Sequence, residues 1–141
     1  MMKFIRIYMS HAIRGARGKD ATVEDMQANN NAASHAARVI RAYLYPLPIE
    51  LYCPGEHDEF VMIAYHKGML SEQQILDTDC KIVTKCDGLI RYSALGPSKG
   101  ADIEVAHADA DNAPVFDMLN LNESYLIQLE KFVEKLCQTN C

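Results

Sequence analysis

Residues 3–9 read KFIRIYM, a run rich in apolar and β-branched side chains that predicts a short buried β-strand. Gly15 and Gly18 then interrupt regular structure, which predicts a polar loop after this strand. Across residues 23–45 apolar side chains recur at helical spacing, and Pro46 ends the pattern. A strand, a loop and a long helix in this order form the first unit of a parallel α/β fold.

The rest of the chain repeats this alternation. Further strands are predicted at residues 49–53, 88–92 and 113–116, and further helices at residues 57–69, 71–86, 98–108 and 123–137. Alternating strands and helices imply a parallel sheet covered on both faces. We therefore expect a three-layer Rossmann-like or flavodoxin-like α/β fold with about five strands, flanked by helices. With 141 residues, 49% of them hydrophobic, the chain is expected to form one domain over residues 1–141.

The charge balance is acidic. Fourteen Lys and Arg residues stand against nineteen Asp and Glu residues, a formal net charge of −5, which argues against a nucleic-acid polymer or an anionic membrane as the main partner. No apolar run approaches the roughly 20 residues that span a bilayer. Residues 1–9 lack the continuous apolar core of a signal peptide, so a cytoplasmic location is expected.

Cysteine usage agrees with a reducing compartment. The five cysteines include no C-x-x-C pair and no histidine at zinc-ligand spacing: Cys53, Cys80, Cys86, Cys137 and Cys141. Neither a disulfide scaffold nor a structural metal site is expected from this pattern.

Ligands of parallel α/β sheets bind beyond the carboxyl ends of the strands, so the loops after Met9, Cys53 and Tyr92 are expected to face one another. The first of these loops carries Arg14 beside Gly15. An arginine fork near exposed backbone N–H groups suits a phosphate or a carboxylate. The alternative is an ordinary solvated loop with basic residues.

The segment from Ser98 to Glu104 reads SKGADIE and opens the helix after the third strand. Ser98 is placed to cap this helix, Gly100 lets a ligand approach the backbone, and the helix N-terminus favours negative charge. Glu104 lies about a turn and a half inside the helix, where a carboxylate can act as nucleophile toward an electrophilic sugar carbon. The alternatives are that Ser98 only caps, that Asp102 only answers the helix dipole, and that Glu104 lies on the surface.

Asp79 is a second candidate carboxylate, near the start of the helix predicted at residues 71–86. Paired carboxylates are useful when one stays ionised and attacks while the other holds or donates a proton. The alternative for Asp79 is a solvated residue in the first turns of its helix.

Three motifs occur together in one order: Tyr8 before Ile13-Arg14-Gly15, Asp79 eight residues before Asp87, and Ser98 with Gly100 and Glu104. Over residues 3–116 this pattern resembles the nucleoside 2-deoxyribosyltransferase superfamily, and by motif it is most similar to the 2'-deoxynucleoside 5'-phosphate N-hydrolase branch. Two positions depart from that branch. His11 and Ala12 stand where Gly-Ser is expected, and Asp102 replaces a usual glycine.

The resemblance implies that Glu104 attacks the anomeric carbon, expels the base and forms a glycosyl-enzyme ester that water resolves. Asp79 would place the sugar and manage the proton of the leaving base, and Tyr8 would orient Glu104 or the sugar. The resemblance also implies a substrate-binding set: Ser10, His11, Ile13, Arg14, Gly15, Ser98, Gly100 and Asp102. It implies no metal and no organic cofactor.

Ser98 bears on the choice of substrate. Deoxyribosyltransferases tend to carry an acid six positions before the nucleophile, where it accepts a hydrogen bond from a free 5'-hydroxyl, whereas a serine can donate to a 5'-phosphate. Together with Arg14, this favours hydrolysis of a (deoxy)nucleoside 5'-monophosphate. The alternatives are a nucleoside 2'-deoxyribosyltransferase that exchanges bases and a non-catalytic nucleotide-binding module. The resemblance also implies a homodimer or higher homo-oligomer, and whether Asp117 or Asn120 completes a neighbouring subunit's site stays open.

Overall fold

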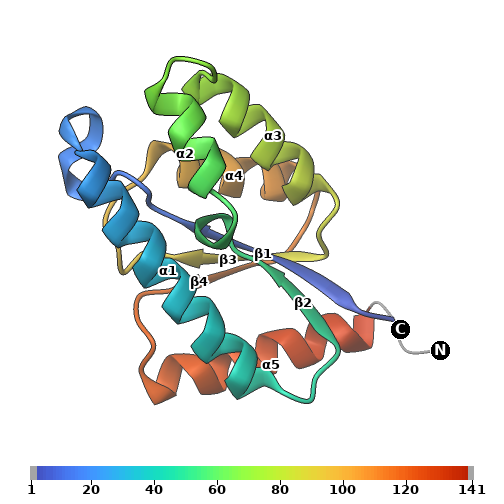
Figure 1. Ribbon diagram of the computed structural model, residues 1–141. Helices are drawn as coiled ribbons and strands as arrows, with labels where there is room; N and C mark the ends of the chain where they lie inside the picture. The colour runs from blue at the N-terminus through green and yellow to red at the C-terminus, as the bar shows by residue number, and fades with distance from the viewer. Residues whose placement is uncertain (1–2, 140–141) are drawn as a thin grey trace.

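The computed structural model describes residues 3–139, in which strands and helices alternate along the chain (Figure 1). The strands of this part of the chain are β1 (Ile5–His11), β2 (Ile49–Tyr52), β3 (Gly88–Tyr92) and β4 (Val115–Met118). The α-helices are α1 (Val23–Leu44), α2 (Glu59–His66), α3 (Glu72–Thr84), α4 (Lys99–Ala110) and α5 (Glu123–Thr139). Two short 3-10 segments, η1 (Gly15–Asp20) and η2 (Pro54–Glu56), follow β1 and β2.

The four strands form one parallel sheet in the order β2-β1-β3-β4. The predicted α/β class with a parallel sheet between helices is confirmed, but the described residues hold four strands where about five were expected. No fifth strand forms within residues 3–139, because η2 and α2 occupy the chain between β2 and α3, where a helix was expected, and α5 follows β4 directly. The order matches the first four strands of a flavodoxin-like sheet, whose ligands bind where the strand order reverses, between β1 and β3.

Each face of the sheet has its own core. Figure 1 shows α1 and α5 on one side of the sheet and α3 and α4 on the other. On β1, Ile5, Ile7 and Met9 belong to the core under α1 and α5, whereas Tyr8 packs with residues of α3, β3 and α4. This split follows from the strand itself, because successive side chains of a strand point to opposite faces.

The helix that starts after Ser71 is capped as the sequence predicts. The Ser71 hydroxyl accepts the Gln74 N–H, and the Gln74 side chain accepts the Ser71 N–H, which is a capping box. One predicted boundary is wrong. The first strand runs to His11, two residues beyond the predicted end at Met9, because backbone pairing with β3 continues through the His11–Tyr92 register pair.

The loops after β1, β2 and β3 meet at one edge of the sheet, as predicted. The Gly55 N–H, after β2, donates to Nε2 of His11 at 3.0 Å. Gly15, with φ of +68°, lies so close to the loop after β3 that a Cβ there would be 3.0 Å from the Leu95 carbonyl oxygen. A glycine is required at this approach for both reasons.

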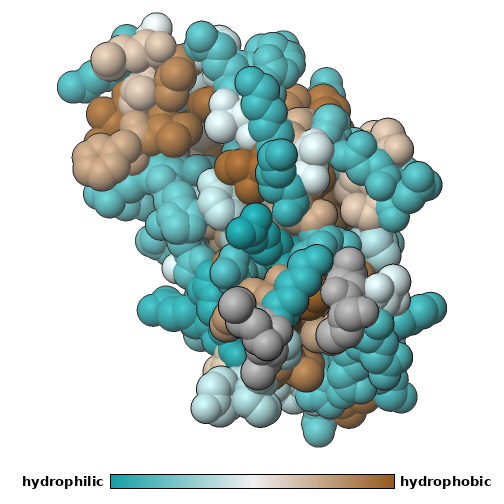
Figure 2. Space-filling model, turned by 90° about the vertical axis from the view of Figure 1, so that its right-hand side faces the viewer, coloured by the Kyte–Doolittle hydropathy of each residue, from teal (hydrophilic) through white to brown (hydrophobic). Residues whose placement is uncertain are grey.

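A group of exposed hydrophobic side chains lies over α2 and the start of α3. Figure 2 shows them gathered at its upper left, over the α2–α3 region, where Phe60, Ile63 and Met69 are exposed. Within residues 3–139, no helix has both the length and the apolar character that a membrane span needs.

The cysteines Cys53, Cys80 and Cys86 carry free thiols, and Cys141 lies outside the described residues.

Candidate active site at the carboxyl edge of the sheet

Glu104 is a buried carboxylate held by two hydroxyl groups. It lies in the second turn of α4 with 5% of its surface exposed, so the alternative that it sits on the protein surface is wrong. The Tyr8 hydroxyl donates a short hydrogen bond to Oε2, and the Ser10 hydroxyl donates to Oε1 at 2.7 Å. Each carboxylate oxygen therefore accepts one hydrogen bond and keeps one further lone pair.

Local sequence explains how these three residues meet. Tyr8 and Ser10 are two apart on β1, so both side chains point to the face that α4 covers. On α4, Ala101, Glu104 and Ala108 are buried at helical spacing and form the side of the helix that faces the sheet. Small alanines on either side of Glu104 let the helix approach β1 closely enough for the hydroxyls to reach the carboxylate.

Two opposing effects set the pKa of Glu104. Burial raises it, the hydrogen bonds from Tyr8 and Ser10 lower it, and the charges of Asp79 and Asp58 raise it further, to about 7. The Tyr8 hydroxyl keeps its proton, because burial and the adjacent Glu104 carboxylate raise its pKa well above the usual value. Glu104 is therefore poised to change charge near neutral pH.

Asp79 and Asp58 are the other carboxylates of this region. Asp79 lies in the middle of α3, half-buried, and not in the first turns where the sequence suggested it. Burial raises its pKa to about 6. Asp58 precedes α2 and is 6% exposed, and burial together with the charge of Asp79 raises its pKa to about 7. Three carboxyl groups with raised pKa values thus influence one another around the end of β1.

Aromatic rings line the same region. The Tyr8 ring stacks on Tyr52 of β2 with centroids 5.5 Å apart, and Tyr52 stacks on His57 at 5.0 Å. Burial, with the charges of Asp79 and Asp58, raises the pKa of Tyr52 to about 12, so its hydroxyl stays protonated. Tyr8, Tyr52 and His57 thus form a stacked aromatic row, in which Tyr8 is fully buried and His57 is exposed.

Arg14 turns toward α2 and α3. Its Nη2 donates to the Tyr65 hydroxyl at 2.7 Å and lies 2.9 Å from a carboxylate oxygen of Glu72. The guanidinium carbon also lies 5.6 Å from the centre of the Tyr65 ring, a cation–π arrangement. The alternative of a freely solvated basic loop does not fit Arg14, which is 23% exposed and bound on two sides.

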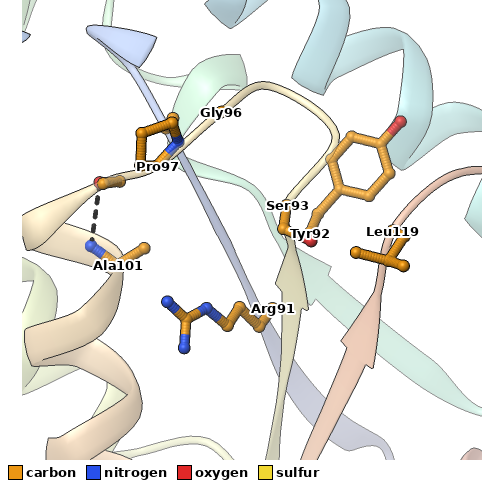
Figure 3. Close-up of a pocket in the computed structure, with 9 residues that line it drawn as sticks. Arg91, Tyr92, Ser93, Gly96, Pro97, Ala101 and Leu119 are labelled. Carbon is orange, nitrogen blue, oxygen red and sulfur yellow. Dashed lines mark hydrogen bonds between the residues drawn. The ribbon is translucent and has the colours of Figure 1, made fainter. Parts of the chain in front are cut away.

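Ser98 caps α4, and its hydroxyl accepts the Ala101 N–H at 3.1 Å. A hydroxyl that accepts one hydrogen bond still has a proton to donate. Ser98 lines a pocket of about 310 Å³ with Arg91, Ala101 and Leu119. In Figure 3, Arg91 extends from β3 toward the first turn of α4, while Tyr92 points to the other side of the sheet.

Arg14 is not among the residues that line this pocket. Asp102, on the outer side of α4, forms an ion pair with Arg91 and is exposed. A Cβ on Gly100 would make only ordinary van der Waals contacts, the nearest at 3.7 Å from Oγ of Ser98.

The first loop holds its other predicted residues through backbone contacts. His11 is 5% exposed, its Nε2 accepts the Gly55 N–H, and its Nδ1 lies 3.1 Å from the Ala12 carbonyl oxygen. Both ring nitrogens are thus engaged, and burial lowers the pKa of the ring, so His11 is a neutral link between two loops. Ile13 is half-buried, and its carbonyl oxygen accepts the Asn29 side-chain amide at 2.7 Å.

Sequence reasoning missed several residues around the site, namely Asp58, Tyr52, Tyr65, Glu72 and Arg91. Asp58 had a signal, because it follows the carboxyl end of a predicted strand by a few residues. Tyr65 and Glu72 had none, since only folding brings them to Arg14. Asp117, in β4, is exposed, and Oδ1 of Asn120 accepts the Asn122 N–H at 2.8 Å. A role of either residue in the site of a neighbouring subunit stays a prediction.

No metal centre forms among residues 3–139, because no three His, Cys, Asp or Glu side chains converge as ligands there. Fold and site together define a parallel α/β domain with a buried, hydroxyl-bound glutamate at the reversal of strand order. Comparisons with protein families, with curated proteins and with solved structures give no match. The resemblance in sequence therefore rests on its motifs alone.

Proposed function

We propose that the protein is an N-glycosidase that hydrolyses the base–sugar bond of a (deoxy)nucleoside 5'-monophosphate through a covalent intermediate on Glu104. One observation supports this most. Glu104 is a buried carboxylate whose two oxygens are fixed by Tyr8 and Ser10 at the edge where α/β sheets bind ligands. A fixed, desolvated carboxylate suits attack on a carbon that becomes an oxocarbenium-like centre.

In the first step, a free lone pair of Glu104 attacks the anomeric carbon. The base leaves with the electrons of the broken carbon–nitrogen bond and takes up a proton. In the second step, water attacks the same carbon and gives a proton to the Asp79 carboxylate, which lost its own proton to the base in the first step. The ester bond to Glu104 breaks, and the Glu104 carboxylate and a sugar 5-phosphate are released. Tyr8 and Ser10 remain hydrogen-bonded to Glu104 and hold its oxygens toward the sugar.

Asp79 supplies the proton for the leaving base in this proposal. Burial raises its pKa to about 6, which leaves a fraction of the carboxyl protonated near neutral pH. Asp58, with a pKa of about 7, is a second proton reservoir next to Asp79. The base would rest against the rings of Tyr52 and His57, which are less buried than Tyr8, since ring stacking suits a planar base.

The 5'-phosphate binds Arg14 in this proposal. Tyr65 supports the guanidinium both through its hydroxyl and through its ring, which fixes the plane of the donor fork. Arg91, which lines a pocket with Ser98, is a second candidate for the phosphate, and Asp102 pairs with it as Glu72 pairs with Arg14. Comparing Arg14→Gln with Arg91→Gln assigns the phosphate, because the variant that lacks the phosphate contact loses the preference for the monophosphate over its nucleoside.

The decisive test separates the products formed from a mixed pool of nucleotides and nucleosides by chromatography. Free base and sugar phosphate are expected from monophosphates, and Glu104→Gln is expected to abolish both. Mass spectrometry of the acid-quenched enzyme is expected to detect the glycosyl ester on the peptide that contains Glu104.

Other outcomes would contradict the proposal. Base exchange between unphosphorylated deoxynucleosides, without hydrolysis of monophosphates, would identify a deoxyribosyltransferase. Calorimetric binding of a monophosphate without turnover, and unchanged in Glu104→Gln, would identify a non-catalytic nucleotide-binding module.

A further inference from the structure

Arg14 is already occupied by an anion from its own chain. A carboxylate oxygen of Glu72 lies 2.9 Å from Nη2, and the same nitrogen donates to the Tyr65 hydroxyl at 2.7 Å. The Tyr65 ring lies under the guanidinium, 5.6 Å from centroid to carbon. The two partners differ in charge, because Tyr65 is a neutral acceptor and Glu72 is an anion.

The three residues come from separate elements. Arg14 follows β1, Tyr65 is in the last turn of α2, and Glu72 is the first residue of α3. The same helix α3 carries Asp79 seven residues further, about 10 Å along its axis. Glu72 therefore lies at the N-terminal end of the helix on which Asp79 lies near the buried carboxylates. Arg14 binds at that end of the helix.

A carboxylate and a phosphate both bind a guanidinium through its N–H donors. Glu72 and Tyr65 both contact Nη2, so the Glu72 carboxylate takes part of this donor edge and opposes a second anion at Arg14 by its charge. An anion at Arg14 therefore binds more tightly when Glu72 leaves, and the contact with the Tyr65 ring can stay in place. Displacing the Glu72 carboxylate from Arg14 costs little free energy, because the Glu72 side chain is 66% exposed and is hydrated again when it leaves. A neutral hydroxyl has no charge with which to displace it.

We propose that Glu72 is a specificity-determining residue, whose carboxylate competes with the substrate's 5'-phosphate for Arg14. The inference rests on the proposed function for the identity of the anion. In this proposal, Tyr65 keeps the Arg14 guanidinium in place while the phosphate replaces the Glu72 carboxylate. Glu72 thereby weakens the binding of every anion to Arg14. A phosphate monoester, with its nearly double negative charge, is the anion best able to displace the Glu72 carboxylate.

The test compares Glu72→Gln with the matched control Glu123→Gln. Each change removes one acid from the first turn of a helix, so loss of the interaction with the helix dipole is common to both, and Glu123 opens α5 on the other side of the sheet. The probes are one nucleoside 5'-monophosphate, its unphosphorylated nucleoside and inorganic phosphate. Binding is measured by calorimetry and turnover by initial rates, and circular dichroism checks that each variant is folded.

In Glu72→Gln, the Kd and KM of the monophosphate are expected to fall about two- to fivefold, the range for an exposed ion pair, with the change confined to KM and not kcat. The Kd of inorganic phosphate should fall likewise, and that of the nucleoside should not change. Glu123→Gln is expected to match the wild type. In an Arg14→Gln background the effect of Glu72→Gln should disappear, because the competition needs both residues.

Results that overturn the inference are distinct from those that overturn the enzymatic proposal. If the wild type hydrolyses monophosphates but Glu72→Gln binds phosphate no better than Glu123→Gln, the competition does not exist. If no monophosphate is hydrolysed, yet Glu72→Gln strengthens phosphate binding only when Arg14 is present, the competition stands and the glycosidase assignment fails. Absence of phosphate binding in all variants overturns the inference as well.

Discussion

The Ser10 hydroxyl donates to Oε1 of Glu104 at 2.7 Å, and this contact joins the end of β1 to the second turn of α4. With Tyr8 on the other oxygen, it fixes a carboxylate that burial would otherwise protonate. Hydrogen bonds to the charged form and burial thus act in opposite directions on one group. The balance places the pKa of Glu104 at about 7, where ionised and neutral forms coexist at neutral pH.

Glu104→Gln is expected to lower kcat/KM for monophosphate hydrolysis by about a thousandfold or more, because an amide is a far weaker nucleophile than a carboxylate. Glutamine has nearly the same shape and keeps an oxygen that can accept from Tyr8 or Ser10, so the fold should persist. Initial rates and circular dichroism check the two statements. Retention of most of the activity would exclude Glu104 as the nucleophile.

Tyr8→Phe is expected to move the acid limb of the pH–kcat/KM profile to higher pH. The Tyr8 hydroxyl lowers the pKa of Glu104, so its loss raises that pKa by about one to two units, the equivalent of one charge-assisted hydrogen bond. Activity that needs ionised Glu104 should then begin at higher pH. Ser10→Ala should act in the same direction, and a limb that stays in place in both variants would contradict the hydrogen-bond account.

Asp58→Asn is expected to move the same limb in the opposite direction, by up to about one unit, because the negative charge of Asp58 raises the pKa of Glu104. The Asp58 side chain makes no capping hydrogen bond at the start of α2, so the substitution should cost α2 little. The matched control is Glu59→Gln at the next position, which is exposed. Equal shifts in the two variants would indicate a general charge effect and not a local one.

Glu104 is also expected to make folding stability depend on pH. Its pKa rises from the usual 4.5 to about 7 on folding, so the stability associated with the protonated form is complete below 4.5 and is lost as pH rises to 7 and beyond. Glu104→Gln removes this loss. Its free energy of unfolding relative to the wild type should therefore increase between pH 5 and pH 8 by about 2 to 3 kcal/mol. Urea unfolding at the two pH values measures this difference, and a difference independent of pH would contradict the raised pKa.

Gly55→Ala and Gly100→Ala should differ in stability. A Cβ on Gly55 would lie 2.9 Å from the Asn30 carbonyl oxygen on α1, so the alanine variant is expected to lose about 1 to 3 kcal/mol of stability by overpacking. A Cβ on Gly100 meets nothing closer than 3.7 Å, and alanine favours a helix, so that variant should be as stable as the wild type or slightly more so. Thermal unfolding compares them. If Gly100→Ala raises KM while keeping stability, a ligand approaches the backbone there.

Local sequence determined the elements and the side on which key residues lie. Alternation along β1 sends Tyr8 and Ser10 to one face, and helical spacing on α4 puts Glu104 between Ala101 and Ala108 on the buried side. These features depend on the period of a strand or helix and need no knowledge of distant contacts. The same holds for the capped start of α3.

The number of strands and the reach of β1 were not determined in this way. Pairing with β3 carries β1 through His11, and such pairing is a property of two segments far apart in the chain. The residues between β2 and α3 formed η2 and α2, which the weak helical signal after His57 predicted only in part.

Only the tertiary structure decided which charges meet. Asp58 reaches the buried carboxylates because the loop after β2 is held by the contact between Gly55 and His11. Arg14 faces Glu72 and Tyr65 because α2 and α3 pack over the first loop. Burial and pairing between distant segments set these pKa values and partners, and neither quantity is encoded in the spacing of residues along the chain. The sequence thus supplied the chemical groups of the site, and the packing of α2, α3 and α4 against β1 supplied their environment.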